Sequence, residues 1–117
     1  MKQVRVALAL AVALNLSAFV AAPAASADAA AYLLNVTVRP GYDFANADAA
    51  LAYGHDVCDT IRRGESYAPI VSEIMADFNT FDEYQAEYLI AQSAQELGPE
   101  LIWQLRRSAG GYRPTPA

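Results

Sequence analysis

The stretch NADAALAYGHDVCDTIRRG, residues 46–64, carries the signals of one complete α-helix. Its apolar and small residues recur three and four positions apart, so they form one continuous stripe along a helix. Asn46 is a favoured N-cap residue, Arg62 falls in the last turn where a cation is favoured, and Gly64 is placed to end the helix. The only cysteine of the chain, Cys58, lies on the apolar stripe. The sequence therefore predicts a helix that carries Cys58 on its buried face.

The first 27 residues have the pattern of a cleavable export signal. A basic start precedes the largely apolar run 6–22, and the small residues Ala25 and Ala27 mark a cleavage site. We expect cleavage after Ala27 and localisation in the cell envelope or the medium. The alternative is an uncleaved membrane anchor, because the apolar run is borderline in length for spanning a bilayer. After cleavage we expect no stable membrane span.

The expected mature chain, residues 28–117, is small and acidic. It keeps all 13 Asp and Glu residues but loses two of the 8 basic residues, which leaves a net charge of −7. A chain with this charge is poorly suited to binding nucleic acid or anionic lipid. We expect no nucleic-acid partner, and a partner, if there is one, is expected to be a protein.

Periodic apolar positions predict an all-α domain over 28–109, built from four or five short helices. Besides the central helix, the expected helices cover 29–36, 66–79, 80–97 and 99–109. No convincing strand pattern is present. Residues 110–117 hold two glycines and two prolines without an apolar stripe, so we expect a disordered tail.

The turn near residue 80 has its own signal. Thr80 and Glu83 have the spacing of a capping box, in which each side chain satisfies an exposed amide at the start of a helix. Phe78 and Phe81 flank this position, and we expect both rings to pin the turn between two helices.

The apolar stripes also predict the residues of the core. They are Leu51, Val57, Cys58, Ile61, Ile70, Ile74, Met75, Tyr88, Leu89, Leu101, Ile102 and Leu105.

Several short motifs together resemble a known family. The most specific is the Gly-x-x-x-Cys stretch from Gly54 to Cys58, where Val57 precedes the cysteine and Gly64 ends the helix. A Gly-Tyr loop at residues 41–42 and a Leu-Gly-Pro-Glu-Leu element at 97–101 accompany it. In these features the chain resembles the small exported, largely mycobacterial domains of domain-of-unknown-function family 732. The resemblance implies a small helical fold and no established activity.

The resemblance also implies a second cysteine, which here is replaced. In that family a cysteine before the proline of the last element typically pairs with the cysteine of the central helix, and the matching position is Gly98. The bridge would close a loop of about 40 residues and contribute roughly 3–4 kcal/mol in the chain-entropy model. Its absence leaves Cys58 without a partner in the chain, although it could link two chains in a dimer.

Cys58 and His55 are the candidates for nucleophilic chemistry. They lie three positions apart, so they are neighbours on a helix surface. We find no motif for an oxyanion site or an orienting group. A metal site is also not expected, because the chain has no second His or Cys and its aspartates lack the spacing of a calcium loop. We therefore expect no catalytic residue, no metal and no cofactor.

Tyr84 and Tyr88 are the candidate binding residues. They lie one helical turn apart and could form part of an exposed recognition surface, or pack through their rings with the hydroxyls in water.

The sequence is compatible with three classes of function. The first is a non-enzymatic interaction or structural module of the envelope or secretome, which predicts an exposed aromatic or apolar patch. The second is a carrier of a small apolar ligand or lipid, which predicts an internal void. The third is an enzyme, which requires Cys58 to be exposed beside His55.

Overall fold

The computed structural model of the chain describes residues 23–113, and all regular structure in that range is helical. This confirms the all-α fold class. In chain order the segments are α2 (Pro23–Thr37), α3 (Ala47–Arg62), α4 (Tyr67–Asp77), α5 (Glu83–Gln92), η1 (Ser93–Leu97), η2 (Pro99–Leu101) and α6 (Ile102–Ala109). Most of the expected export signal lies outside the described residues. None of the helices in the described range is long and apolar enough to cross a membrane.

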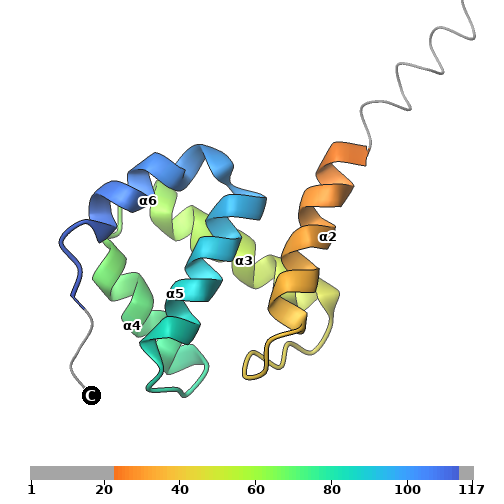
Figure 1. The fold of residues 1–117 in the computed structure, drawn as a ribbon, viewed down its shortest axis with the longest axis horizontal. Coiled ribbons are helices and arrows are strands. Elements are labelled where there is room, and N and C mark those ends of the chain that lie inside the picture. Colours follow the sequence, from red (N-terminus) through yellow and green to blue (C-terminus); the bar gives the residue numbers. More distant parts are fainter. Residues whose placement is uncertain (1–22, 114–117) are drawn as a thin grey trace, which may run out of the picture.

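Helix α5 and its continuation η1 form the middle of the fold. They contact α2 and α3, and α4 packs against α5 while α6 packs against η1. Figure 1 shows α2 on one side of α5 and the pair α4 and α6 on the other, with α3 passing behind. The central segment is therefore covered on several sides, which explains why Leu89 and Ile90 are fully buried.

The central helix α3 forms as its sequence predicts. The Asn46 side chain accepts a hydrogen bond from the Ala49 amide at 2.8 Å, and Gly64 follows the helix with a left-handed φ of 87°. Ala50, Val57 and further small and apolar residues of the stripe are buried. These signals all lie within or next to the helix, which explains why the sequence alone predicts it.

The core differs in part from its prediction. Predicted residues that are buried are Val57, Cys58, Ile61, Ile70, Ile74, Leu89 and Leu101. Predicted residues that are only partly buried are Leu51, Met75, Tyr88, Ile102 and Leu105. Buried apolar residues outside the predicted core set are Tyr32, Val36, Tyr42, Ala50, Tyr67, Val71, Ala86, Ile90 and Ala94, of which Ala50 lies on the predicted stripe of α3.

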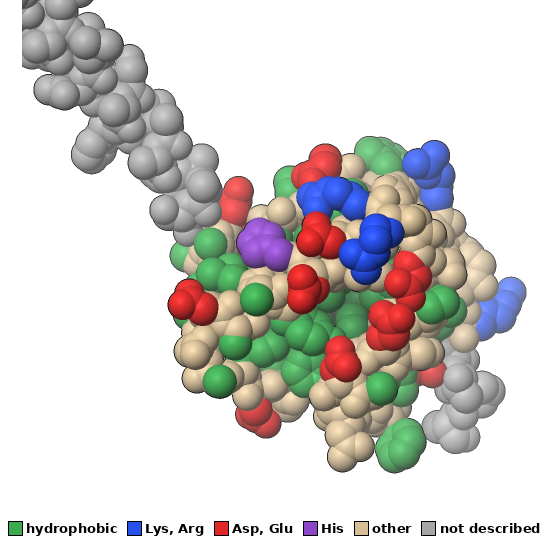
Figure 2. All heavy atoms as spheres, turned by 180° about the vertical axis from the view of Figure 1, so that it is seen from behind, with side chains coloured by type: hydrophobic (Ala, Val, Ile, Leu, Met, Phe, Trp, Pro, Cys, Tyr) green, Lys and Arg blue, Asp and Glu red, His purple; other side chains and the backbone are tan. Residues whose placement is uncertain are grey.

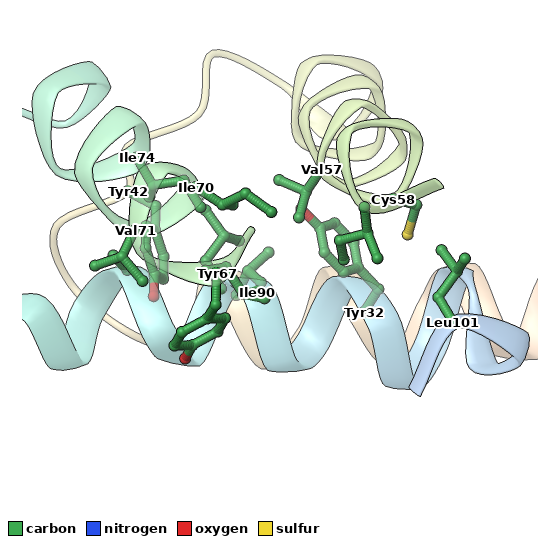
Figure 3. Close-up of a cluster of buried hydrophobic side chains, with 14 of the residues drawn as sticks. Tyr32, Tyr42, Val57, Cys58, Tyr67, Ile70, Val71, Ile74, Ile90 and Leu101 are labelled. Carbon is green, nitrogen blue, oxygen red and sulfur yellow. The ribbon is translucent and has the colours of Figure 1, made fainter. Parts of the chain in front are cut away.

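Three of these unpredicted residues are tyrosines, and Figure 3 shows Tyr32, Tyr42 and Tyr67 among the aliphatic core residues. The Tyr32 hydroxyl donates to the Ala50 carbonyl oxygen at 2.8 Å, and the Tyr42 hydroxyl donates to the Gln85 carbonyl oxygen at 2.6 Å. A tyrosine can be buried when its hydroxyl finds a partner, and such partners come from distant helices that periodicity does not reveal.

The predicted capping box is wrong. Asp82 is the N-cap of α5, and its carboxylate accepts from the Tyr84 amide at 3.0 Å. The Thr80 hydroxyl oxygen instead accepts from the Asp82 amide at 3.0 Å. Glu83 is consequently the first residue of the helix rather than its third, because the aspartate two positions later competes successfully for the cap.

The expectation that both phenylalanines pin this turn holds for only one of them. Phe78 packs against the rings of Tyr42, Phe44 and Tyr53, with centroid distances of 5.1–5.6 Å. Phe81 is 100% exposed and contributes nothing to the packing of the turn.

Two further segments differ from expectation. The predicted helix over 80–97 ends in η1, a π-helical stretch with a wider turn than an α-helix. In the segment expected to be a disordered tail, the ring of Tyr112 packs edge-on against Tyr67 at 5.0 Å, so the expectation does not hold for this residue. Residues 114–117 lie outside the described range.

Candidate interaction surface

Helix α5 places Tyr84 and Tyr88 on one side of the molecule. Their ring centroids are 6.5 Å apart and the rings are tilted by 36°. Tyr84 is exposed and Tyr88 is half-buried. The structure therefore combines the two predicted arrangements, because the ring of Tyr84 is exposed and the ring of Tyr88 is partly packed.

Arg39, which the sequence analysis did not single out, completes this group. It lies in the loop between α2 and α3, and its guanidinium carbon is 4.0 Å from the ring centroid of Tyr88 and 5.3 Å from that of Tyr84. Both distances are within the range of cation–π interactions. In the sequence, Arg39 stands out only because no other Lys or Arg occurs between Arg5 and Arg62.

The loop that carries Arg39 is fixed closely against α5. Gly41 has a φ of 108°, and a Cβ at this position would lie 2.7 Å from the Gln85 side-chain nitrogen. The next residue, Tyr42, donates its hydroxyl hydrogen bond to the Gln85 carbonyl oxygen. Burial raises the pKa of Tyr42 to about 12, partly offset by the positive charge of Arg39. Arg39 is thus held by neighbours that are anchored in the core.

Hydrogen bonds between α2 and α5 hold the other side of the group. The Tyr88 hydroxyl donates to the Asn35 carbonyl oxygen at 3.4 Å, and the Asn35 side-chain amide donates to Gln92 Oε1 at 2.7 Å. The positions of the tyrosine rings relative to α2 are therefore determined by tertiary contacts as well as by helix α5.

Two exposed apolar side chains precede Arg39 in the sequence, Leu34 in the last turn of α2 and Val38 directly after this helix. Leu34 is 62% exposed and Val38 is 69% exposed, and the Val38 amide donates to the Leu34 carbonyl oxygen in the same turn. We call the group Leu34, Val38, Arg39, Tyr84 and Tyr88 the Arg39 surface. It combines one cation, two aromatic rings and two aliphatic side chains.

A pocket of about 320 Å³ adjoins the Arg39 surface. Leu33, Val36 and Phe44 give it apolar walls, while Arg39 and Asp43 add opposite charges. Its volume is at the lower limit of small-molecule pockets.

Cys58 lies in a different and closed environment. The residue is buried, and its thiol donates to the Ser93 carbonyl oxygen with a sulfur–oxygen distance of 3.3 Å. Figure 3 shows the sulfur directed toward the segment that carries Leu101. Burial raises the pKa of the Cys58 thiol to about 11, which disfavours the thiolate. Cys58 is the only cysteine of the chain, so no disulfide forms within it.

His55 and Cys58 do not form a site together at the surface. His55 is exposed while the Cys58 thiol is buried and engaged with Ser93. Within residues 23–113, no three His, Cys, Asp or Glu side chains are grouped so that they could hold a metal ion. On the face drawn in Figure 2, carboxylates lie scattered around an apolar area.

The fold and these surfaces define a small all-α domain with exposed aromatic and apolar groups and a buried, unpaired cysteine. A family model described as a protein of unknown function, DUF732, matches residues 26–100. The match covers well over half of the sequence, and the chain belongs to this family. No curated protein and no solved structure matches the chain.

Proposed function

We propose that the chain is a non-enzymatic interaction module that binds a protein partner through the Arg39 surface. One observation carries this proposal, namely that Arg39 is held over the rings of Tyr84 and Tyr88 at the surface, and the exposed Leu34 and Val38 precede it in the chain. Arginine and tyrosine are over-represented among the residues that dominate protein interfaces. Because the tertiary contacts already position these side chains, binding would cost little additional ordering.

The chemistry of the surface restricts the partner. The guanidinium of Arg39 presents N–H donors, which suit a carboxylate or a carbonyl oxygen. Leu34 and Val38 suit apolar side chains next to that acceptor. We therefore propose a protein segment that presents an acidic or carbonyl group beside aliphatic residues.

We further propose that the protein acts in the envelope or secretome of an actinobacterium, after removal of residues 1–27. The basic start, the apolar run and the small residues before Asp28 support this localisation. Production of the full chain with a C-terminal tag, followed by fractionation and intact-mass measurement, tests it. The variant Ala27→Phe is the matched control, because a large residue at the cleavage site should block processing.

Site-specific photo-crosslinking in the producing cell tests the interaction. A photoreactive residue at Val38 should give a discrete crosslinked product, whereas the same residue at the exposed Gln95 of η1 should not. Arg39→Ala should reduce the product at least about tenfold, as expected for a central interface residue. Arg39→Lys, which keeps the charge but lacks the planar guanidinium, should give an intermediate yield.

Equal products from both positions, or an unchanged yield in Arg39→Ala, would rule out the Arg39 surface as the interface. Thermal unfolding of each variant provides the control for folding. A melting temperature within a few degrees of the wild type shows that a lost product reflects binding.

The carrier of a small apolar ligand is the second candidate, because the pocket of about 320 Å³ has apolar walls from Leu33, Val36 and Phe44. Native mass spectrometry of the protein from its producing cell tests this alternative. A carrier should show a bound species of defined mass, and Ala47→Trp should remove it, because Ala47 lines the pocket and is exposed. Protein without any bound species would reject it.

We also propose that Gly98 occupies a position that holds a second cysteine in related domains. A Cβ at residue 98 would lie 3.5 Å from the Cys58 Cβ, within the range for disulfides. The φ of Gly98 is −148°, a value open to residues other than glycine.

A further inference from the structure

The pocket of about 320 Å³ beside the Arg39 surface lies where α2, the loop that follows it and the start of α3 meet (Figure 1). Leu33, Val36 and Phe44 give it apolar walls. An apolar cavity of about 150 Å³ binds benzene, so this pocket has room for one large apolar side chain and part of the backbone that carries it. In size it therefore matches one residue of a partner.

Two opposite charges belong to the lining of this pocket. Arg39 and Asp43 both line it, and they form no ion pair with each other in the described structure. The guanidinium of Arg39 only donates hydrogen bonds, whereas the carboxylate of Asp43 only accepts them. A ligand that fits both groups therefore presents a charged acceptor and an N–H donor close to each other.

Asn46 adds a second donor to the lining. Its side-chain oxygen accepts a hydrogen bond from the Ala49 amide at 2.8 Å, so the nitrogen of the same side chain is left to donate. Together with the guanidinium of Arg39, the pocket has donors for both oxygens of a carboxylate.

Contacts with the core hold this lining in place. Asp43 lies between two anchored aromatic residues, Tyr42 and Phe44. Tyr42 is buried and its hydroxyl donates to a carbonyl oxygen of α5, while the Phe44 ring packs edge-on against Phe78 at 5.6 Å. Because the walls are already positioned, a ligand would lose little affinity to their ordering.

We propose that this pocket binds the C-terminal residue of the partner protein, with the terminal carboxylate on Arg39 and the apolar side chain between the pocket walls. The assignment rests on the proposed function and names the part of the partner that the Arg39 surface recognises. A C-terminal residue carries a carboxylate, a side chain and a backbone N–H on one Cα, so the N–H is close enough to serve Asp43. Capture of a terminal carboxylate is a recurring mode of peptide recognition. An internal Asp or Glu has its carboxylate on the side chain, so the same residue cannot also fill the apolar pocket.

Asp43 also restricts the residues that precede the terminus. Its carboxylate repels a second negative charge close to Arg39, and the chain as a whole carries a net charge of −5. The expected partner therefore presents a single carboxylate at this site, preceded by neutral or basic residues.

Enrichment from two peptide pools tests the proposal. The full chain, in the form that the producing cell accumulates, is immobilised and offered random octapeptides that end either in a free carboxylate or in an amide. The free-acid pool should be enriched in peptides with a large apolar last residue, and the amide pool should yield at least about tenfold less bound peptide, as expected for the loss of a charged acceptor. Equal yields from the two pools, no enrichment, or enrichment without an apolar last residue would each overturn the proposal.

Variants of the lining show whether the peptides bind in this pocket. For the most enriched peptide, Ala47→Trp should raise the dissociation constant at least about tenfold, because Ala47 is an exposed lining residue and an indole ring would fill the pocket. Arg39→Gln should weaken binding as much and remove the difference between the acid and the amide. A dissociation constant that Ala47→Trp leaves unchanged would contradict the assignment.

Arg107→Gln is the matched control, because it removes one exposed arginine from α6, outside the pocket. It should leave peptide binding unchanged, and an equal loss in this variant would mean that Arg39 contributes only net charge. Thermal unfolding of each variant shows that it is folded.

Photo-crosslinking at Val38 separates this inference from the proposed function. Ala47→Trp should reduce the crosslinked product as Arg39→Ala does. A product that depends on Arg39 but is unchanged in Ala47→Trp would keep the Arg39 surface as the interface and overturn only the assignment of the pocket to a C-terminal residue.

Discussion

The residues around Cys58 are buried, whereas the turn between α4 and α5 exposes a large apolar side chain. At Cys58 the thiol is buried and bonded to Ser93, and a Cβ placed on Gly98 would lie 3.0 Å from the sulfur. At the α4–α5 turn, Phe81 is fully exposed beside a hollow of 290 Å³.

This difference separates residues that stabilise the fold from residues that do not. Side chains around Cys58 have their partners within the chain, and substitutions there should change the free energy of unfolding. Phe81 is fully exposed, so its substitution should change that free energy very little. Four predictions test this division, beginning with the largest expected effect.

Gly98→Cys should form a disulfide with Cys58 and stabilise the domain by about 3–4 kcal/mol, the chain-entropy value for a loop of about 40 residues. The two Cβ atoms would be 3.5 Å apart. Denaturant unfolding with and without a reductant measures the gain. Gly98→Ala is the control, because its Cβ meets Leu101 Cδ1 at 3.0 Å and forms no bond, so a loss of about 1 kcal/mol is expected. If Gly98→Cys keeps two free thiols under oxidising conditions, the packing described here is wrong.

Phe78→Ala should destabilise the domain by about 2–3 kcal/mol, because the half-buried ring contacts three other aromatic rings. Phe81→Ala, three positions later, should stay within about 0.5 kcal/mol of the wild type. Chemical denaturation of both variants measures the difference. Equal losses of stability in the two variants would show that Phe78 and Phe81 contribute equally to the packing of the turn.

Alkaline pH should lower the free energy of unfolding, because buried groups around Cys58 resist losing their protons. Burial raises the pKa of Cys58 to about 11 and that of Tyr32 to about 12, so the folded state keeps protons that the unfolded state loses. This stability is complete below about pH 9 and is lost as the pH rises through the folded pKa values. Between pH 8 and pH 10 we expect a loss of about 1 kcal/mol. Denaturant midpoints at each pH measure it, and Cys58→Ala should show a smaller loss. A midpoint constant up to pH 11 would contradict the prediction.

Glu100→Gln should have the smallest effect, with almost no change in the denaturant midpoint. Arg62 contacts Glu100 at 2.6 Å and Asp59 at 2.8 Å, but all three side chains are about half exposed. The difference from the wild type should vanish at high salt. Unfolding curves at low and high salt measure it, and a loss as large as that of Phe78→Ala would show that this surface ion pair contributes substantially to stability.

The sequence predicted best what depends on neighbours along the chain. The start at Asn46, the end at Gly64 and the buried face of α3 all rest on residues within that helix. The cap of α5 was misassigned because Thr80 and Asp82 can both accept backbone hydrogen bonds there, and the sequence does not rank them.

The remaining features depend on contacts between distant segments. Tyr32 and Tyr42 are buried because carbonyl oxygens 18 and 43 positions away accept their hydroxyl hydrogen bonds. Arg39 joins Tyr84 and Tyr88 only because the loop after α2 folds onto α5. Periodicity identified the two tyrosines as a candidate surface, but it contains no information about which loop residue reaches them.

The contact between Cys58 and Ser93 has a consequence for the folding of the chain. It joins residues 35 positions apart, so the thiol is shielded only after α3 and η1 have come together. In the oxidising compartment that the proposed export implies, a newly released chain therefore has an interval in which its sulfur can react, and this interval ends when the native contact forms. Covalent dimers should accumulate when folding is slow and should be rare among chains that have already folded. Their amount under non-reducing conditions would measure folding efficiency rather than native assembly.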